Sequence, residues 1–367
     1  MKETALPKVV HIITTLERGG AEKQLVILCK EQIKIGLKCS VLYLKGNGEL
    51  ESELISNGIN TMKLNSALKY YQFIKQMFID KKMIVHAHLP RAEVLAYLTI
   101  ILLKRNFFVS RHNTEKFYPS KPIFISSAIS RIILSRSSRV IAISEAVKKH
   151  IIENDEIFSN QTNKISVIHY GYDPDFNDES NAKRDYLQHK FMVGSISRLT
   201  AQKDLGTLIQ AFAIFNRSYP ESELVILGEG EDRKKLSELI SQLEIAKSVI
   251  LPGRSEDVHE FLNKLDVFVL SSRYEGFGLV LLEAMQSNVP ILCTNISALP
   301  EVVGENFPGL FEVGDIARLS KLLLDSVDLP FARSLTKGYQ AQLKKFDPRS
   351  MAQKYLIIYE MNKFLGQ

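Results

Sequence analysis

Short apolar runs of strand length alternate with longer segments of helical periodicity along almost the whole chain. The strand-like runs of the first half lie at residues 9–13, 40–44, 84–88, 107–110, 140–143 and 165–169. Those of the second half lie at residues 191–196, 223–227, 249–251, 267–270, 290–293 and 309–313. Strands that alternate with helices form parallel sheets with helices on both faces, so we predict an α/β fold of two doubly wound, Rossmann-like halves.

A polar segment at residues 173–190 separates the two halves. It is rich in Asp, Asn and Ser and lacks an apolar period, which is typical of a linker. We expect residues 1–178 and residues 190–346 to form two domains, as the length of 367 residues also favours. Residues 347–367 are expected to form an amphipathic helix, because apolar side chains recur there every three to four positions, at Met351, Tyr355, Ile358, Met361 and Leu365.

The composition excludes several classes of protein. Hydrophobic residues make up 45% and charged residues 24% of the chain, as in globular proteins and unlike disordered, collagen-like or coiled-coil chains. The longest uncharged apolar stretch, residues 94–103, is too short for a bilayer, and the N-terminus lacks a signal peptide, so we expect a cytoplasmic protein. The three cysteines form no Cys-x-x-Cys pair, so neither a disulfide framework nor a zinc site is expected.

The most specific chemical pattern follows the fourth strand-like run of the second half. Gly276 and Gly278 allow backbone amides to approach a ligand closely, and a helix starting near Leu279 would attract an anion to its N-terminus. Glu275 precedes this helix and Glu283 lies about one turn into it, so both carboxylates can face one cavity and accept hydrogen bonds from sugar hydroxyls. The pattern predicts a ligand with both phosphate and sugar. The alternative is that Glu283 only favours the helix N-terminus electrostatically while Glu275 is solvated.

The stretch from Glu275 to Glu283 contains Gly276-Phe277-Gly278. It resembles the Glu-x7-Glu motif of glycosyltransferase family 4, a family of retaining nucleotide-sugar glycosyltransferases of the GT-B fold. Further stretches that resemble the family occur in the family's order: Gly19-Gly20-Ala21-Glu22, residues 194–204, residues 227–231, residues 251–254 and the segment from Asp347 onward. The resemblance implies two Rossmann-like domains that face each other across a cleft. It also implies that the first domain binds the acceptor, that the second binds the nucleotide sugar, and that the C-terminal helix crosses back to the first domain.

The resemblance also assigns donor-binding residues. Arg198 and Lys203 would hold the donor diphosphate, for which a planar guanidinium fork and a compact ammonium are well suited. The rest of the donor-binding set is Gly19, Gly20, Gly228, Arg254, Glu275, Gly276, Phe277, Gly278, Leu279 and Glu283. Taken alone, each of the two cations would be interpreted as an ordinary surface charge.

His112 follows the strand-like run at residues 107–110, where the resemblance puts a histidine that faces the donor sugar. The resemblance implies retention of the anomeric configuration, in which the donor's own phosphate takes the acceptor proton. His112 would then hydrogen-bond the sugar or its developing positive charge rather than abstract a proton. With His112, the residues Glu275, Arg198 and Lys203 form the expected catalytic set. Without the resemblance, a single histidine in a loop would support no functional prediction.

Two groups of residues have a spacing that invites a metal ion. His86 and His88 project from the same side of a strand, but no third ligand is evident, and we expect them to line the acceptor cleft or to cap the sheet. Asp173 and Asp175 have the Asp-x-Asp spacing of metal-dependent glycosyltransferases of a different fold, yet the rest of that fold is not found in the sequence. We therefore expect neither a metal ion nor a cofactor.

Positive charge is concentrated in one part of the first half. The net charge is +6, and residues 61–150 hold 16 Lys and Arg against 4 Asp and Glu. In residues 68–82 and 122–136 these cations alternate with bulky apolar side chains, as in segments that lie in a lipid interface. We expect this surface to dock on an anionic membrane and, since no nucleic-acid-binding motif is found, expect no nucleic acid partner. The structural alternative is that both stretches are helices that bury one face against the sheet.

Together these observations predict a retaining, metal-independent glycosyltransferase. It would move a sugar from a nucleotide diphosphate sugar, expected to be a UDP-sugar, to a glycan or lipid-linked acceptor such as a lipid-linked oligosaccharide, lipopolysaccharide or capsule precursor. It would act peripherally on the cytoplasmic face of the inner membrane. Two alternatives stay open, a nucleotide-sugar epimerase on the same scaffold and a non-catalytic nucleotide-sugar-binding subunit. The second would be expected to lack Glu275, Lys203 or His112, and this chain has all three.

Overall fold

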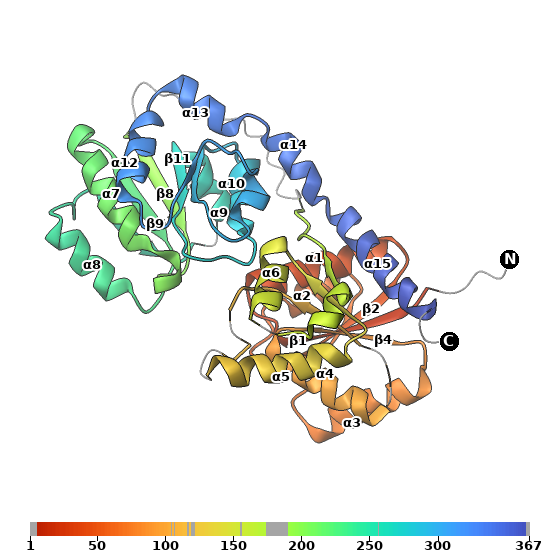
Figure 1. Cartoon of the computed structure of the whole chain (residues 1–367). Helices are drawn as coiled ribbons and strands as arrows, with labels where there is room; N and C mark the ends of the chain where they lie inside the picture. Colours follow the sequence, from red (N-terminus) through yellow and green to blue (C-terminus); the bar gives the residue numbers. More distant parts are fainter. Residues whose placement is uncertain are drawn as a thin grey trace. The chain divides into compact units, whose positions relative to one another are not determined.

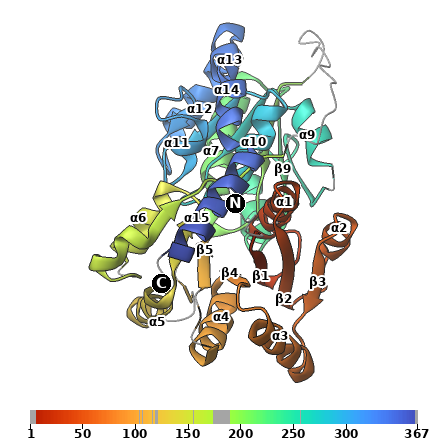
Figure 2. The same ribbon diagram turned by 90° about the vertical axis from the view of Figure 1, so that its right-hand side faces the viewer.

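The computed structural model describes residues 6–173 and 190–364, except residues 104, 106, 116, 119–121, 155 and 256. The chain folds into two compact units (Figure 1; Figure 2). Unit 1 comprises Met1–Asp173 and Phe346–Gln367, and unit 2 comprises Pro174–Lys345. The expected linker at residues 173–190 lies, apart from its two end residues, outside the described part of the chain. No helix of the described part is long and apolar enough to cross a bilayer.

The sheet of unit 1 has seven parallel strands in the order β3-β2-β1-β4-β5-β6-β7. The strands are β1 (Lys8–Thr15), β2 (Lys38–Lys45), β3 (Asn60–Lys63), β4 (Ile84–His88), β5 (Phe107–Arg111), β6 (Arg139–Ala142) and β7 (Ile165–Val167). Most residues of β1, β4 and β5 are buried on both faces, so their apolar residues form continuous runs. The sequence did not predict β3, because this edge strand has one apolar residue, Met62, and stays partly exposed.

Helices connect the strands of unit 1 and cover its sheet. They are α1 (Gly20–Lys34), α2 (Glu51–Ser56), α3 (Ala67–Ile79), α4 (Pro90–Leu103), α5 (Ile123–Arg136) and α6 (Glu145–Glu153). The chain re-enters unit 1 with α15 (Pro348–Phe364), which packs against α1. The apolar positions that predicted this helix explain its place, because Met351, Tyr355 and Ile358 are buried in the core of unit 1.

The sheet of unit 2 has six parallel strands in the order β10-β9-β8-β11-β12-β13. The strands are β8 (Met192–Ile196), β9 (Glu223–Leu227), β10 (Val249–Gly253), β11 (Val267–Leu270), β12 (Ile291–Thr294) and β13 (Leu310–Phe311). The helices are α7 (Leu205–Ser218), α8 (Arg233–Gln242), α9 (Val258–Lys264), α10 (Leu279–Gln286), α11 (Leu299–Val303), α12 (Ile316–Asp325), α13 (Leu329–Thr336) and α14 (Tyr339–Leu343).

The order of the strands reverses beside the first strand of each sheet. β1 lies between β2 and β4, and β8 lies between β9 and β11. In open parallel sheets, ligands bind at this point, outside the carboxyl ends of the strands. Gly19 follows β1, His88 ends β4, Lys203 follows β8 and Glu275 follows β11, so these predicted residues lie at the two reversal points. The two doubly wound parallel sheets predicted from the sequence are confirmed.

Candidate active site

The loops after β8 and β11, which are neighbouring strands of unit 2, are joined by hydrogen bonds. The Gln202 side chain donates through Nε2 to the Tyr274 carbonyl oxygen at 3.0 Å, and the Arg273 amide donates to the Gln202 carbonyl oxygen at 2.8 Å. Asp204, which has a left-handed backbone with φ of 45°, pairs with Arg273 at 3.1 Å. These contacts fix the two loops against each other at the carboxyl ends of the strands.

Lys203 and Glu275, one from each of these loops, form an ion pair between Nζ and Oε1. The Ser272 hydroxyl donates to the same carboxylate oxygen at 2.7 Å, and the Ser271 hydroxyl donates to the Lys203 carbonyl oxygen at 2.9 Å. Only 14% of the Lys203 side chain and 11% of the Glu275 side chain are exposed, so solvent screens this pair weakly. The fold therefore brings together two predicted site residues that are 72 positions apart in the sequence.

Arg198 lies exposed in the loop after β8, where its Nη2 donates to Oε1 of Gln202 at 3.0 Å. Beside it, the hydroxyl oxygens of Ser197 and Thr200 are buried without a hydrogen-bond partner among the described residues. Buried polar groups without partners are costly, so these hydroxyls are suited to a polar ligand. The sequence analysis did not single them out, because a serine or threonine in a loop is too common to indicate a site.

Gly228 is required by a close approach between two loops. It has a φ of 139°, and a Cβ atom at this position would collide with the Ser197 carbonyl oxygen. The Ser197 amide donates to the Leu227 carbonyl oxygen at 3.0 Å. Gly228 therefore supports the backbone of the loop that carries Arg198.

Helix α10 begins directly after Gly278, which occupies the N-cap position with a φ of 90°. A side chain at Gly278 would be strained, because this left-handed conformation favours glycine. Phe277 is buried, whereas Gly276 and Leu279 are half-buried. Glu283 is half-buried in the second turn of the helix. The predicted start of this helix at Leu279 is confirmed.

Arg254 is exposed after β10, which is separated from β8 by β9. In the loop after β9, Glu229 forms a bidentate pair with Arg233 at 2.8 and 2.9 Å. These hydrogen bonds lower the pKa of Glu229, and the charge of Arg254 adds to the decrease. Unit 2 thus contains the following members of the predicted donor set: Arg198, Lys203, Gly228, Arg254, Glu275, Gly276, Phe277, Gly278, Leu279 and Glu283.

Gly19, Gly20 and His112, the other predicted site residues, belong to unit 1. Gly19 is the N-cap of α1, and Gly20 is its exposed first residue, so the pair forms the turn at the carboxyl end of β1. Glu22, in the first turn of α1, accepts a hydrogen bond of 2.5 Å from the Thr15 hydroxyl. This bond ties the start of the helix to the end of the strand.

The imidazole of His112 is held by two hydrogen bonds within unit 1. Its Nε2 lies 3.0 Å from Nδ1 of His88, and its Nδ1 lies 2.6 Å from the Tyr170 hydroxyl. Burial, with a contribution from the charge of Arg111, lowers the pKa of His112 to about 3, so the ring is neutral at physiological pH. Neither hydrogen-bond partner could be predicted from the sequence.

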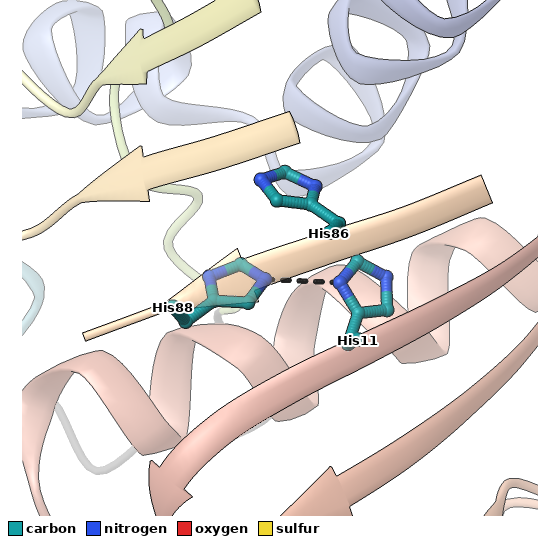
Figure 3. A group of neighbouring side chains, drawn as sticks. All are labelled: His11, His86 and His88. Carbon is teal, nitrogen blue, oxygen red and sulfur yellow. Dashed lines mark hydrogen bonds between the residues drawn. The ribbon is translucent and has the colours of Figure 1, made fainter. Parts of the chain in front are cut away.

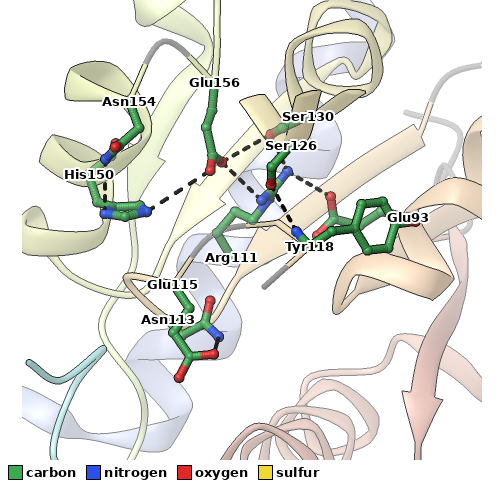
Figure 4. Close-up of polar contacts among 10 residues, drawn as sticks. All are labelled: Glu93, Arg111, Asn113, Glu115, Tyr118, Ser126, Ser130, His150, Asn154 and Glu156. Carbon is green, nitrogen blue, oxygen red and sulfur yellow. Dashed lines mark hydrogen bonds and ion pairs between the residues drawn. The ribbon is translucent and has the colours of Figure 1, made fainter. Parts of the chain in front are cut away.

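Arg111, the residue before His112, belongs to a separate buried ion cluster (Figure 4). Its Nη2 lies 3.0 Å from a Glu93 carboxylate oxygen, and its Nη1 lies 3.0 Å from Glu156, which also accepts from the Ser130 hydroxyl at 3.0 Å. Burial raises the pKa of Glu93 to about 7, the charge of Arg111 opposes this increase, and Glu156 adds to it. The cluster joins α4, β5 and α5 and explains why this part of unit 1 tolerates buried charge.

His11 completes a group of three buried histidines with His86 and His88 (Figure 3). His11 lies opposite His86 in the register of β1 and β4, so the sequence alone did not reveal this third member. All three side chains are at most 1% exposed, so the expectation that His86 and His88 line a cleft is wrong. The His86 and His88 rings stack, with 4.4 Å between centroids and 23° between planes. One nitrogen from each of the three rings lies within 4.8 Å of the others, but in the structure every ring nitrogen has a hydrogen-bond partner.

Two family models match adjoining parts of the chain: Glycosyltransferase Family 4 over residues 18–176, and Glycosyl transferases group 1 over residues 177–337. The uncharacterized glycosyltransferase MJ1059 of Methanocaldococcus jannaschii is 29% identical over 282 residues, which cover 71% of this chain and 68% of that protein. The N-acetylgalactosamine-N,N'-diacetylbacillosaminyl-diphospho-undecaprenol 4-alpha-N-acetylgalactosaminyltransferase of Campylobacter jejuni is 23% identical over 326 residues, which cover 83% of this chain and 86% of that protein.

Among solved structures, that of Anabaena HepE in complex with UDP-glucose matches with a TM-score of 0.81 and 20% sequence identity. The match covers 97% of this chain and 99% of that one. At this level of identity the likeness concerns the fold. The GT-B fold expected from the sequence, with one parallel-sheet α/β domain in each unit, is confirmed.

Proposed function

Because the chain belongs to the glycosyltransferases of the GT-B fold, we propose that it transfers a sugar, with retention and without a metal ion, from a UDP-sugar to a lipid-linked oligosaccharide, lipopolysaccharide or capsule precursor. The observation that carries this proposal is the shielded ion pair of Lys203 with Glu275 at the strand reversal of unit 2. The pair places a cation suited to phosphate next to a carboxylate suited to sugar hydroxyls. A nucleotide sugar requires both groups side by side.

We assign the donor diphosphate to the loop after β8 and the start of α10. Arg198 offers an exposed guanidinium, and the unpartnered hydroxyls of Ser197 and Thr200 lie in the same loop. The N-terminus of α10, which follows Gly278, adds backbone amides and a partial positive charge. Lys203 completes this set as a compact positive charge beside Glu275.

We assign Glu283 to a ribose hydroxyl and Glu275 to the transferred sugar. An ionised carboxylate accepts several hydrogen bonds, so each can bind a hydroxyl while keeping a protein partner. Glu275 already accepts from Ser272 and Lys203, which fix its orientation. The bound UDP-glucose named for the HepE structure supports a UDP-sugar as the donor of this chain.

In the proposed reaction, the acceptor hydroxyl bonds to the anomeric carbon on the face from which the diphosphate departs. The bond from the anomeric carbon to the diphosphate oxygen breaks, and the departing diphosphate takes the acceptor proton. Arg198 and Lys203 stabilise the charge of that leaving group, the task that a divalent cation has in metal-dependent transfer. We assign His112 to the donor sugar, where its neutral ring does not repel the developing positive charge.

The acceptor is assigned to unit 1. The name of the Campylobacter relative specifies a diphospho-undecaprenol acceptor, which supports a lipid-linked acceptor here. The two alternatives from the sequence, an epimerase and a non-catalytic binding subunit, are less well supported. Glu275 and Lys203 are paired in a shielded site, and His112 is hydrogen-bonded at both ring nitrogens. A non-catalytic subunit would not need these side chains to be positioned in this way.

A lipid-linked acceptor agrees with the surface of unit 1, which we propose to dock on the anionic cytoplasmic face of a membrane. Helix α3 buries Phe73 and Met77 but exposes apolar and basic side chains together: Leu68, Tyr71, Lys75, Phe78, Ile79, Lys81 and Lys82, the last two just beyond its end. Helix α5 exposes Ile123, Phe124, Ile132 and Arg136. Both helices therefore bury one face, as the structural alternative held, and still offer a basic apolar surface.

The proposed function is tested by donor binding and turnover. A panel of nucleoside diphosphate sugars is added to the full-length protein, its thermal unfolding is followed, and slow hydrolysis of each donor is then measured. We expect UDP and at least one UDP-sugar to raise the unfolding temperature, since a ligand that binds only the folded state stabilises it. The UDP-sugar that binds should also be hydrolysed slowly. No stabilisation by any nucleotide would contradict the proposal.

A further inference from the structure

A chain of hydrogen-bonded side chains runs through unit 1 from α1 to the segment after β7. His11 Nε2 lies 2.8 Å from Oε1 of Gln32. His11 Nδ1 lies 3.0 Å from Nε2 of His88, the contact drawn as a dashed line in Figure 3. His88 Nδ1 lies 3.0 Å from Nε2 of His112, whose Nδ1 lies 2.6 Å from the Tyr170 hydroxyl. His11, His88 and His112 belong to or directly follow β1, β4 and β5, which are adjacent in the sheet.

The chain has a direction because the Gln32 oxygen can only accept. His11 therefore donates through Nε2, and its Nδ1 is left as an acceptor. His88 must then donate through Nε2 to His11, and His112 must donate through Nε2 to His88. The Tyr170 hydroxyl donates to the remaining lone pair of His112, on Nδ1. Every ring is neutral in this arrangement, and each carries its proton on Nε2.

A proton added to His11 or His88 would break the chain. A protonated imidazole donates from both nitrogens, so one link would then join two donors. Burial acts in the same direction, since it lowers the pKa of His11 to about 4 and that of His112 to about 3, and lowers that of His88 well below its ordinary range. The charge of Arg111, whose ion cluster Figure 4 shows, also opposes protonation of His112.

We propose that His88 is a positioning residue for His112, and that the hydrogen-bonded chain ending on Gln32 fixes the His112 ring as the neutral tautomer with its proton on Nε2. His88 is 1% exposed and acts through His112, so it is not itself a catalytic residue. The inference rests on the proposed role of His112 at the donor sugar. A ring fixed in this form presents a constant, uncharged group where positive charge develops on the sugar.

His86 provides a matched control. It lies on β4 two residues before His88, is fully buried, and stacks on the His88 ring. Its ring nitrogens bond instead to the Tyr359 hydroxyl at 2.6 Å and the Ser110 hydroxyl at 2.9 Å. The variant His86→Phe therefore removes an equally buried histidine without interrupting the chain to His112.

The test is nitrogen NMR of the full chain with ¹⁵N-labelled histidines, in which long-range proton couplings identify the protonated nitrogen of each ring. Assignments come from single histidine variants. In the unaltered protein we expect His11, His88 and His112 to carry their proton on Nε2 throughout pH 5.5 to 8.5. In His88→Phe, the proton of the neutral His112 ring should no longer be confined to Nε2. In His86→Phe, it should stay on Nε2. His112 protonated on Nδ1 or averaged between forms in the unaltered protein, or unchanged in His88→Phe, would overturn the proposal.

Gln32 extends the test to the far end of the chain if His88→Phe fails to fold. The variant Gln32→Glu keeps a hydrogen-bond acceptor for His11 and should preserve the His112 tautomer. The variant Gln32→Met removes that acceptor, so His112 should no longer be confined to this tautomer. Equal His112 spectra in both Gln32 variants would contradict a chain directed by this residue.

Activity provides a second readout. Where transfer is measured, His88→Phe should lower kcat about tenfold or more with donor KM nearly unchanged, and His86→Phe should not. If the His112 tautomer responds to the variants as expected but the protein shows no transferase activity, the proposed function is refuted while the positioning role of His88 still holds.

Discussion

Lys203 forms an ion pair with Glu275 in the structure. In the proposed reaction, the same ammonium group also binds the donor diphosphate. Replacing Lys203 or Arg198 with alanine should weaken binding of free UDP by about 1.5–3 kcal/mol, the range for a hydrogen bond to a charged group. Calorimetric titration measures this loss. Lys234→Ala serves as the control, because that side chain is 91% exposed on α8. Unchanged UDP affinity in both test variants would refute the assignment of the diphosphate.

Glu275 and His112 should separate binding from chemistry. We assign them to the transferred sugar and not to the nucleotide, so Glu275→Gln and His112→Ala should bind free UDP as the unaltered protein does. Their kcat should fall by at least about 100-fold, because their interactions strengthen as charge develops on the sugar. Steady-state kinetics and UDP titration on the same preparations measure both quantities. Full activity of His112→Ala would remove that residue from the mechanism.

Glu93 should make the stability of unit 1 depend on pH. Its pKa is raised from an ordinary value of 4.5 to about 7, so between these pH values the native state binds more protons than the unfolded state. The contribution of Glu93 to the free energy of unfolding therefore falls as the pH rises from about 4.5 to about 7, by on the order of 3 kcal/mol. Urea denaturation at pH 5 and pH 8 measures it by comparison with Glu93→Gln. The variant should gain stability relative to the unaltered protein at the higher pH; an equal difference at both pH values would contradict the raised pKa.

At the scale of elements, we predict that the exposed surface of α3 and α5 docks on a membrane. Vesicles with anionic lipid should bind the protein in flotation, and added salt should weaken the binding, since cations near an anionic surface contribute about 1 kcal/mol each. Neutralising Lys69, Lys75, Lys81 and Lys82 should reduce flotation. Neutralising Lys234, Lys235, Lys321 and Lys337, which are exposed in unit 2, should not. Equal recovery with neutral and anionic vesicles would argue against this surface.

Every strand-like apolar run that the sequence shows overlaps a strand of the structure. The pattern is clearest in the central strands β1, β4, β5 and β11, because a parallel strand with helices on both faces is apolar almost throughout. β3 was not predicted, because this edge strand, Asn60-Thr61-Met62-Lys63, is partly exposed and has too few apolar residues to form a pattern. α10 was predicted at its first residue because Gly278 marks a left-handed turn that only a few residue types adopt readily.

At the scale of the whole molecule, the sequence singled out the candidate site loops but not the contacts between them. Lys203 meets Glu275 only because β8 and β11 become neighbours, although β9 and β10 separate them in the chain. His11 bonds to His88 for the same reason, because β1 and β4 are neighbours and place His11 opposite His86, two residues before His88, and no local spacing signals such a contact. The unpartnered hydroxyls of Ser197 and Thr200 are likewise visible only once burial is known.

The two units also differ in charge, which fits a division of labour between them. Unit 1 holds 28 Lys and Arg against 17 Asp and Glu, whereas unit 2 holds 19 Lys and Arg against 24 Asp and Glu. A basic unit 1 suits an anionic, lipid-linked acceptor, whereas the acidic unit 2 would have to bind the proposed anionic donor through a few placed cationic groups. On this account, salt should weaken action on a membrane-bound acceptor more than binding of free UDP.

The anomeric configuration of the transferred sugar tests the central claim most directly. The full chain is incubated with the UDP-sugar that binds it and a diphosphate-lipid glycan acceptor, and proton NMR of the isolated product reports the configuration at the new bond. We predict a product with the configuration of the donor, formed equally well in the presence of a metal chelator. A product of inverted configuration, or no transfer from any nucleoside diphosphate sugar that binds, would contradict the account.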